Sequence, residues 1–138
     1  MTELYLADKS ALARSNLPPV KAVLMPLHKR GLLAICPPVE YEMMFSLRSK
    51  GEMPAVGKWL RGFDYLYCEY EDCERALEIQ RLAIERGFHR ALSWADLQIA
   101  ATAERHGATL LHHDGDYDMI ASLTGQRTQW VVPPGSAD

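Results

Sequence analysis

The chain has 138 residues, of which 48% are hydrophobic and 24% charged, so one globular domain with an ordinary core is expected. Its formal net charge of −3 argues against a protein that coats nucleic acid by charge alone, but not against a nuclease whose metal ions offset an acidic site. The sequence shows no basic leader segment and no apolar run of about 18 residues, so we expect neither secretion nor membrane insertion. Three cysteines without CxxC spacing indicate reduced thiols of a cytoplasmic protein: Cys36, Cys68 and Cys73.

Short apolar strands alternate with helical stretches along the chain. The predicted strands cover residues 4–7, 32–36, 64–68, 109–111 and 128–132. The predicted helices begin with one near residue 9 that breaks at Pro18, and continue at about 20–30, 37–49, 54–62, 71–86, 93–106 and 117–123. This alternation predicts an α/β fold, a three-layer α/β/α domain with a short, mainly parallel sheet of about five strands. Residues 1–138 should form a single domain, with a frayed tail over 133–138.

Acidic residues recur where the apolar stretches end. Asp8 directly follows the first predicted strand, and Asp114 and Asp116 follow the fourth. A carboxylate at the edge of a core is unfavourable unless something pairs with its charge, because burying an unpaired charge costs free energy. The carboxyl ends of parallel strands line one crevice, and carboxylates gathered there repel one another unless a hard cation neutralises them. The sequence therefore predicts a metal-dependent enzyme.

Two further acids lie on predicted helices. Asp96 follows Ser93 at the spacing of a capping box, yet it shares a helical face with the apolar Ile99, which should pack on the sheet. Glu42 lies on the buried-looking face of the helix after the second strand. Glu40 is two residues away, so it cannot face the same way.

Each acidic motif also has a purely structural interpretation. Asp8 and the Ser93–Asp96 pair can cap helices, and the Glu40–Glu42 pair can be a solvated face. The segment that begins at Asp114 can be a turn before the last helix. It is not an EF-hand loop, because the required glycine falls on Met119 and the final glutamate falls on Gly125. The order of the four motifs along the chain, rather than any one of them, favours the functional interpretation.

The other polar residues give weaker signals. The five histidines have neither metal-site nor triad spacing. Trp59 and Phe63 suggest an apolar surface for a partner or a second subunit. Four basic residues around them could follow a nucleic-acid backbone or form a solvated face: Arg48, Lys50, Lys58 and Arg61.

Four stretches of the sequence, in this order, resemble the PIN-domain ribonucleases and, more closely, the VapC toxins of bacterial toxin–antitoxin pairs. The resemblance extends over essentially the whole chain. Each stretch alone is a weak motif, but four in order at this chain length are specific. The stretches are residues 5–14, 36–46, 93–103 and 110–121.

The resemblance implies an acidic site that binds Mg²⁺ or Mn²⁺. It assigns Asp8, Asp96 and Asp114 as direct ligands, and Glu42 and Asp116 as ligands that bind directly or through water. The glutamate of the family lies four residues before a small residue, which selects Glu42 over Glu40.

Two further positions follow from the same resemblance. Ser10 would orient a metal ligand or contact phosphate. Many relatives have a basic residue between the paired acids, where this chain has Gly115, which leaves a phosphate contact there open but removes no metal ligand.

The resemblance also implies a function. Such proteins are metal-dependent endoribonucleases that cut RNA of the tRNA or rRNA class and so inhibit translation. They form homodimers, and a cognate VapB-type antitoxin neutralises them by inserting a segment across the active groove.

Two alternatives remain open. One is a non-catalytic PIN-like module that binds RNA or protein. The other is an aspartyl-phosphate phosphatase or receiver-like domain, in which Asp8 would be the nucleophile. The phosphatases need a second aspartate where this chain has Ser10.

Overall fold

Five short strands form one sheet in which every neighbouring pair is parallel. The computed structural model describes residues 3–137. The strand order is β3-β2-β1-β4-β5. The predicted parallel sheet is therefore confirmed. The strands are β1 (Tyr5–Ala7), β2 (Leu33–Ile35), β3 (Asp64–Tyr65), β4 (Thr109–His112) and β5 (Thr128–Trp130).

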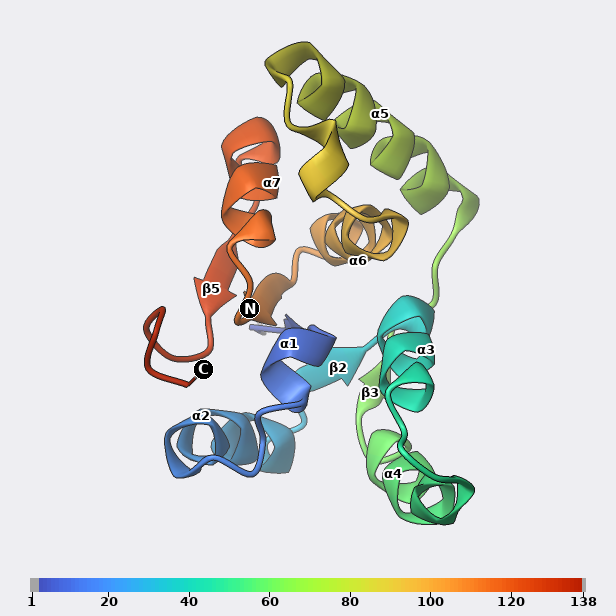
Figure 1. The fold of residues 1–138 in the computed structure, drawn as a ribbon, viewed down its shortest axis with the longest axis vertical. Coiled ribbons are helices and arrows are strands. Elements are labelled where there is room, and N and C mark those ends of the chain that lie inside the picture. Colours follow the sequence, from blue (N-terminus) through green and yellow to red (C-terminus); the bar gives the residue numbers. More distant parts are fainter. Residues whose placement is uncertain (1–2, 138) are drawn as a thin grey trace.

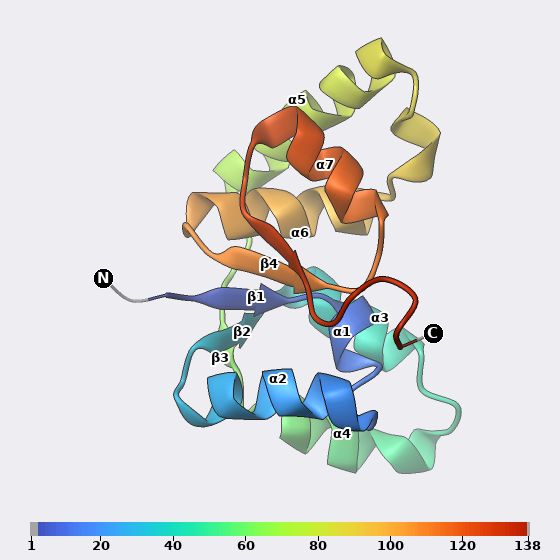
Figure 2. The ribbon, with the colours of Figure 1, turned by 90° about the vertical axis from the view of Figure 1, so that its left-hand side faces the viewer.

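The helices cover both faces of this sheet (Figures 1 and 2). In Figure 2, α2 and α4 lie below the sheet and α5, α6 and α7 lie above it, while α1 and α3 begin at the carboxyl ends of the strands. This is the predicted three-layer arrangement. The helices are α1 (Lys9–Leu12), α2 (Pro18–Lys29), α3 (Pro37–Phe45), α4 (Met53–Leu60), α5 (Tyr70–Arg86), α6 (Trp94–Arg105) and α7 (Asp116–Thr124), with 3-10 turns η1 (Lys50–Glu52) and η2 (His89–Ala91).

The central strand β1 is apolar because helices cover both of its faces. Leu6 lies opposite Ala34 of β2 and Leu110 of β4, and all three side chains are fully buried. A parallel strand with two buried faces carries a continuous apolar run rather than an alternating one. The run therefore ends where burial ends, and the polar residues begin directly after it.

Local signals in the sequence set the ends of the long helices. A reciprocal capping box between Glu69 and Asp72 starts α5, and Gly87 ends it in the left-handed conformation at φ 81°. The Ser93 hydroxyl accepts a hydrogen bond from the Asp96 backbone N–H at 3.1 Å, which starts α6. The capping role expected for Ser93 is thus confirmed.

Several element boundaries differ from the sequence-based prediction. Helix α1 ends at Leu12 rather than at Pro18, and β5 ends at Trp130 rather than at residue 132. The third strand covers Asp64–Tyr65 rather than residues 64–68, because β2 ends at Ile35 and its chain then turns into α3. Helix α3 ends at Phe45 rather than near residue 49. The hydroxyl of Ser46 donates to the Glu42 carbonyl at 2.8 Å, a competing bond typical of serine at helix ends.

The C-terminal segment packs back on the domain. The sequence predicts a frayed tail over 133–138, but the structure buries Val132 and Ala137. The Arg14 guanidinium Nε donates to the Ala137 carbonyl at 2.8 Å, which holds the segment against α1. Residues 133–136 remain exposed, so this contact concerns Ala137, and the expected fraying stays a prediction; position 138 lies outside the described residues.

The structure also gives the state of the cysteines and tests for membrane-spanning helices. All three cysteines are free thiols, as the sequence indicates. Among the described residues, no helix combines the length and the apolar character needed to span a bilayer.

We predict that Leu6→Ala lowers the free energy of unfolding by about 2–5 kcal/mol, the usual cost of a cavity in a packed core. The matched control is Leu77→Ala on α5, where the leucine is 52% exposed and the expected change is within about 0.5 kcal/mol. Urea unfolding followed by circular dichroism measures both. Equal effects of the two substitutions would contradict this packing of β1.

Candidate metal centre

The sheet topology creates a crevice at the carboxyl ends of β1 and β4. The chain runs from β1 to β2 and β3 on one side, and β4 and β5 lie on the other side. Such a reversal of strand order is where α/β sheets bind their ligands. Ala7 pairs with Leu111, and the Asp8 backbone N–H donates to the Leu111 carbonyl at 2.9 Å. The residues that follow the two strands therefore lie together.

A polar pocket of about 500 Å³ opens at this crevice. Four of the five predicted site acids line it, so the structure brings together residues from α3, α6 and the segments that directly follow β1 and β4. Its lining comprises Asp8, Lys9, Ser10, Ala13, Arg14, Glu42, Asp96, His113, Asp114 and Gly115.

Three carboxylates are close enough to share one cation. Asp96, Asp114 and Asp116 each offer an oxygen, and these oxygens lie within 4.8 Å of one another. The Asp116 backbone N–H also donates to Asp114 Oδ1 at 2.9 Å, which fixes the Asp114 carboxylate relative to Asp116. Carboxylate oxygens are hard donors, so this set suits Mg²⁺ or Mn²⁺ rather than a thiol-seeking metal.

Asp8 is the most constrained of the acids. Its side chain is 4% exposed, and its Oδ2 accepts hydrogen bonds from the Ser10 backbone N–H at 2.9 Å and the Ser10 hydroxyl at 2.6 Å. Asp8 is thus the N-cap of α1 as well as a wall of the pocket. The helix-capping interpretation of Asp8 is confirmed, and its role as a metal ligand stays a prediction.

Ser10 links the residues that directly follow β1 and β4. Its hydroxyl donates to Asp8 and accepts from the His113 backbone N–H at 2.9 Å. Ser10 therefore orients Asp8, which is one of the two roles expected for it.

Burial and like charge raise the pKa values of three carboxyls in this region. The pKa of Asp96 rises to about 6, mainly through desolvation and then through the carboxylates of Asp8 and Asp114. Burial, followed by Asp8 and Asp96, also raises the pKa of Glu42, while Lys9 opposes this rise.

The pKa of Asp116 is raised for the same reasons as those of Asp96 and Glu42. Its pKa is raised by desolvation and by the neighbouring Asp114. The acids thus repel one another in the absence of a cation, which is the electrostatic condition that favours divalent metal binding.

Glu40 lies apart from the cluster, as predicted. Its carboxylate accepts a hydrogen bond from the Tyr65 hydroxyl at 2.8 Å. Two positions that lie two residues apart on α3 thus differ in role: Glu40 is structural, and Glu42 lines the pocket.

Comparison with known proteins identifies the family of the chain. The family model described as PIN domain matches residues 10–123. Ribonuclease VapC21 of Mycobacterium tuberculosis is 43% identical over 138 residues, which cover 99% of this chain and 100% of the relative. The chain belongs to the PIN-domain family, among the VapC-type toxins.

A further relative supports the same placement, and a solved structure shares the fold. Ribonuclease VapC51 of Mycobacterium tuberculosis is 38% identical, over 97% of each chain. A chain in the crystal structure of DNA-bound VapBC from Salmonella typhimurium is 12% identical and aligns with a TM-score of 0.79, over 96% of this chain and 100% of that one. At that identity the likeness concerns the fold alone. Because the chain belongs to the PIN-domain family, the alternative of an aspartyl-phosphate phosphatase or receiver-like domain is no longer supported.

Sequence reasoning missed Tyr117 of this PIN domain. Its side chain is fully buried, and its hydroxyl donates to Asp8 Oδ1 at 2.7 Å and lies 3.3 Å from Asp96 Oδ1. The sequence offers only one signal for it, a tyrosine directly after the second paired acid on a helix that also buries Ile120.

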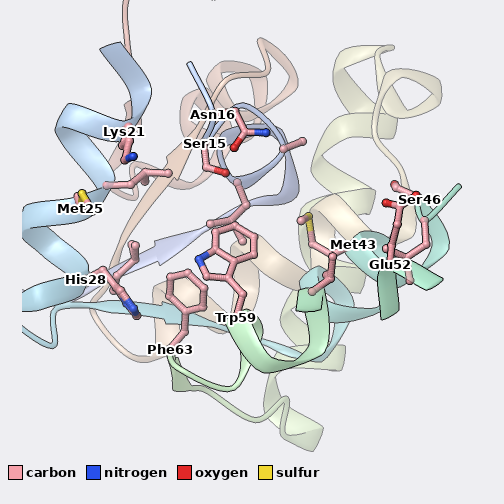
Figure 3. Close-up of a pocket in the computed structure, with 16 residues that line it drawn as sticks. Ser15, Asn16, Lys21, Met25, His28, Met43, Ser46, Glu52, Trp59 and Phe63 are labelled. Atoms are coloured by element: carbon pink, nitrogen blue, oxygen red, sulfur yellow. The ribbon is translucent and has the colours of Figure 1, made fainter. Parts of the chain in front are cut away.

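The PIN domain also has an apolar groove of about 720 Å³ between α1, α2, α3 and α4 (Figure 3). Trp59 and Phe63 line it with their ring centroids 5.3 Å apart in an edge-to-face arrangement, and the His28 ring lies 4.6 Å from that of Phe63. Ala13 lines both this groove and the acidic pocket, so the two are contiguous. The apolar surface predicted from Trp59 and Phe63 is thus present.

We predict that Asp96→Asn stabilises the metal-free protein at pH 7.5, by about 2–6 °C in melting temperature, allowing for solvent screening of a partly exposed group. The pKa of Asp96 in the folded state, about 6, lies above its ordinary 3.8. Below about pH 4 the carboxyl is protonated in both the folded and the unfolded state, so the folded protein carries no charge penalty there. The penalty appears, and stability is lost, as the pH rises through about 6. The gain from the substitution should therefore vanish at pH 4.

Thermal unfolding in EDTA at both pH values tests this. The matched control is Asp64→Asn, which changes an exposed aspartate on β3. A variant less stable than the parent at pH 7.5 would contradict the electrostatic strain assigned to the cluster.

Proposed function

We propose that this protein is a metal-dependent endoribonuclease that acts as the toxin of a toxin–antitoxin pair. The observation that supports this most directly is the set of three carboxylates within 4.8 Å of one another at the β1–β4 crevice of a PIN domain. The relatives named ribonuclease VapC support the choice of RNA as the substrate.

The family resemblance, rather than the geometry, assigns the roles of the acids, since the three oxygens that lie within 4.8 Å of one another belong to Asp96, Asp114 and Asp116. Asp8, Asp96 and Asp114 hold Mg²⁺ or Mn²⁺ directly, and Glu42 and Asp116 complete the site directly or through water. A divalent cation bound there supplies a water of lowered pKa and neutralises charge on the scissile phosphate. Ser10 keeps Asp8 in place through its hydroxyl.

Lys9 takes over the phosphate contact that Gly115 cannot make. It lines the pocket and opposes the raised pKa of Glu42, so its positive charge acts on the site. Arg14 also lines the pocket, but its guanidinium is already bound to the carbonyls of Ser10 and Ala137. These two bonds leave other N–H donors of Arg14 unused, but they hold its guanidinium in place, whereas no side-chain hydrogen bond holds Lys9 among the described residues, so we assign the phosphate contact to Lys9.

The cellular role follows from the VapC relationship. We place the protein in the cytoplasm as a homodimer that cuts single-stranded or loop RNA of the tRNA or rRNA class and so blocks translation. Free thiols at all three cysteines support this compartment.

We assign the apolar groove to a segment of a VapB-type antitoxin. Its contiguity with the acidic pocket lets one amphipathic segment fill both, with apolar side chains over Trp59 and Phe63 and a basic side chain at the carboxylates. Such a segment would compete with the metal for the same negative charge. The solved VapBC complexes of similar fold support a partner of this class.

The catalytic proposal predicts discrete cleavage of bacterial total RNA in Mg²⁺ or Mn²⁺ and none in EDTA. Asp114→Asn should reduce the rate by more than about 100-fold, since even groups that only support metal ligands lower activity by about 10–100-fold. The control is Asp118→Asn, a neighbouring aspartate that accepts a hydrogen bond from Trp130 outside the cluster. Absence of cleavage by folded, metal-supplied protein would favour the non-catalytic binding module.

The groove assignment predicts that Trp59→Ala weakens an inhibiting antitoxin by about 30-fold or more, the loss typical of a buried aromatic anchor. Cleavage by the free variant should match that of the parent, because Trp59 lies outside the acidic pocket. Titration calorimetry and an RNA cleavage assay measure the two effects. Tyr70→Ala, at an exposed aromatic on α5 away from the groove, is the control, and equal losses from both variants would exclude the groove as the site.

A further inference from the structure

Tyr117 brings a hydroxyl into the acidic cluster from inside the core. It lies in the first turn of α7, and no part of its side chain is exposed. Its ring packs against His112 at 5.1 Å, a contact that a phenylalanine ring would also make. The hydroxyl is therefore not required to fill space, and a buried hydroxyl needs a polar partner.

The partners of this hydroxyl are two carboxylates from different elements. Its oxygen lies 2.7 Å from Asp8 Oδ1, at the end of β1, and 3.3 Å from Asp96 Oδ1, in the first turn of α6. A phenol carries one hydrogen, so it donates to one acceptor at a time. The shorter distance assigns that hydrogen to Asp8.

The bond from Tyr117 completes the restraint on Asp8. Ser10 holds Oδ2 with two donors, and Tyr117 holds Oδ1 with a third. With both oxygens held, the carboxylate cannot rotate about its terminal bond without breaking a hydrogen bond. The remaining lone pairs of Asp8 therefore keep one direction relative to the pocket.

The same hydroxyl also sets the separation of two acids. Asp8 and Asp96 both approach one oxygen atom, so that atom limits how far apart their nearest oxygens lie. Without it, two carboxylates at this distance would face each other with no donor between them and would move apart.

We propose that Tyr117 is a positioning residue of the metal centre, which acts by fixing the Asp8 carboxylate and its spacing from Asp96. The inference rests on the proposed function, because it concerns the acids assigned to Mg²⁺ or Mn²⁺. Tyr117 touches neither cation nor RNA in this role.

The test is the affinity for Mn²⁺ of Tyr117→Phe, measured by electron paramagnetic resonance of free Mn²⁺ and by calorimetry. We expect the Kd to rise about 10-fold or more, as for other groups that orient metal ligands. At saturating Mn²⁺ the KM for RNA should stay unchanged, because the hydroxyl does not reach the substrate.

The matched control is Tyr65→Phe. The Tyr65 hydroxyl also donates to a carboxylate, that of Glu40 at 2.8 Å, but away from the cluster. Its removal should leave the Mn²⁺ Kd unchanged. Equal Mn²⁺ affinity of Tyr117→Phe and the parent would overturn the inference, and so would an equal loss in both variants. A parent that binds no Mn²⁺ would instead overturn the proposed function.

A double-mutant cycle tests the route through Asp8. In an Asp8→Asn background, Tyr117→Phe should change the Mn²⁺ Kd by less than about 2-fold, because residues in one hydrogen-bond network are not additive. A full additional 10-fold loss would show that Tyr117 acts on the metal by another route and would overturn the role assigned here.

One measurement needs no substitution at Tyr117. The ¹³Cζ resonance of this residue, assigned by through-bond connectivity, should shift during a Mg²⁺ titration of the unmodified protein with the same Kd that calorimetry gives. A resonance that does not move while Mg²⁺ binds would overturn the inference even if Tyr117→Phe failed to fold.

Discussion

The parallel pairing of β1 with β4 is the contact on which the site depends. It places the residue after Ala7 beside the residues after Leu111, and it does so at the point where the strand order reverses. The acids that follow these strands then meet, and α3 and α6 add Glu42 and Asp96 from the neighbouring elements. Because both strands are buried on both faces, the register that sets this meeting is held by the core.

Repulsion between the carboxylates opposes this arrangement. Desolvation and like charge raise the pKa values of Glu42, Asp96 and Asp116, so the metal-free site carries charges that the fold alone does not pair. Hydrogen bonds from Ser10 and Tyr117 restrain Asp8 within this region. A site strained in this way is typical of function, since a fold selected only for stability would neutralise or remove such acids.

The sequence predicts the layers, the parallel sheet and the acids because these depend on local pattern. Apolar runs mark buried strands, and Asp8 and Asp114 mark where the runs end. It cannot predict the roles of Tyr117 or Ala137, because each depends on contacts between distant segments. Tyr117 resembles an ordinary core residue of its helix, and the packing of Ala137 depends on Arg14, more than a hundred residues earlier.

The central claim, that these carboxylates bind a divalent cation, is tested most directly by thermal unfolding with and without Mn²⁺. A ligand that binds only the folded state at about 100 times its Kd adds about 2.7 kcal/mol of stability, which raises the melting temperature by several degrees. We expect this rise for the parent and none for Asp114→Asn. A parent indifferent to Mn²⁺, or an equal rise in the variant, would contradict the assignment of the cluster as a metal centre.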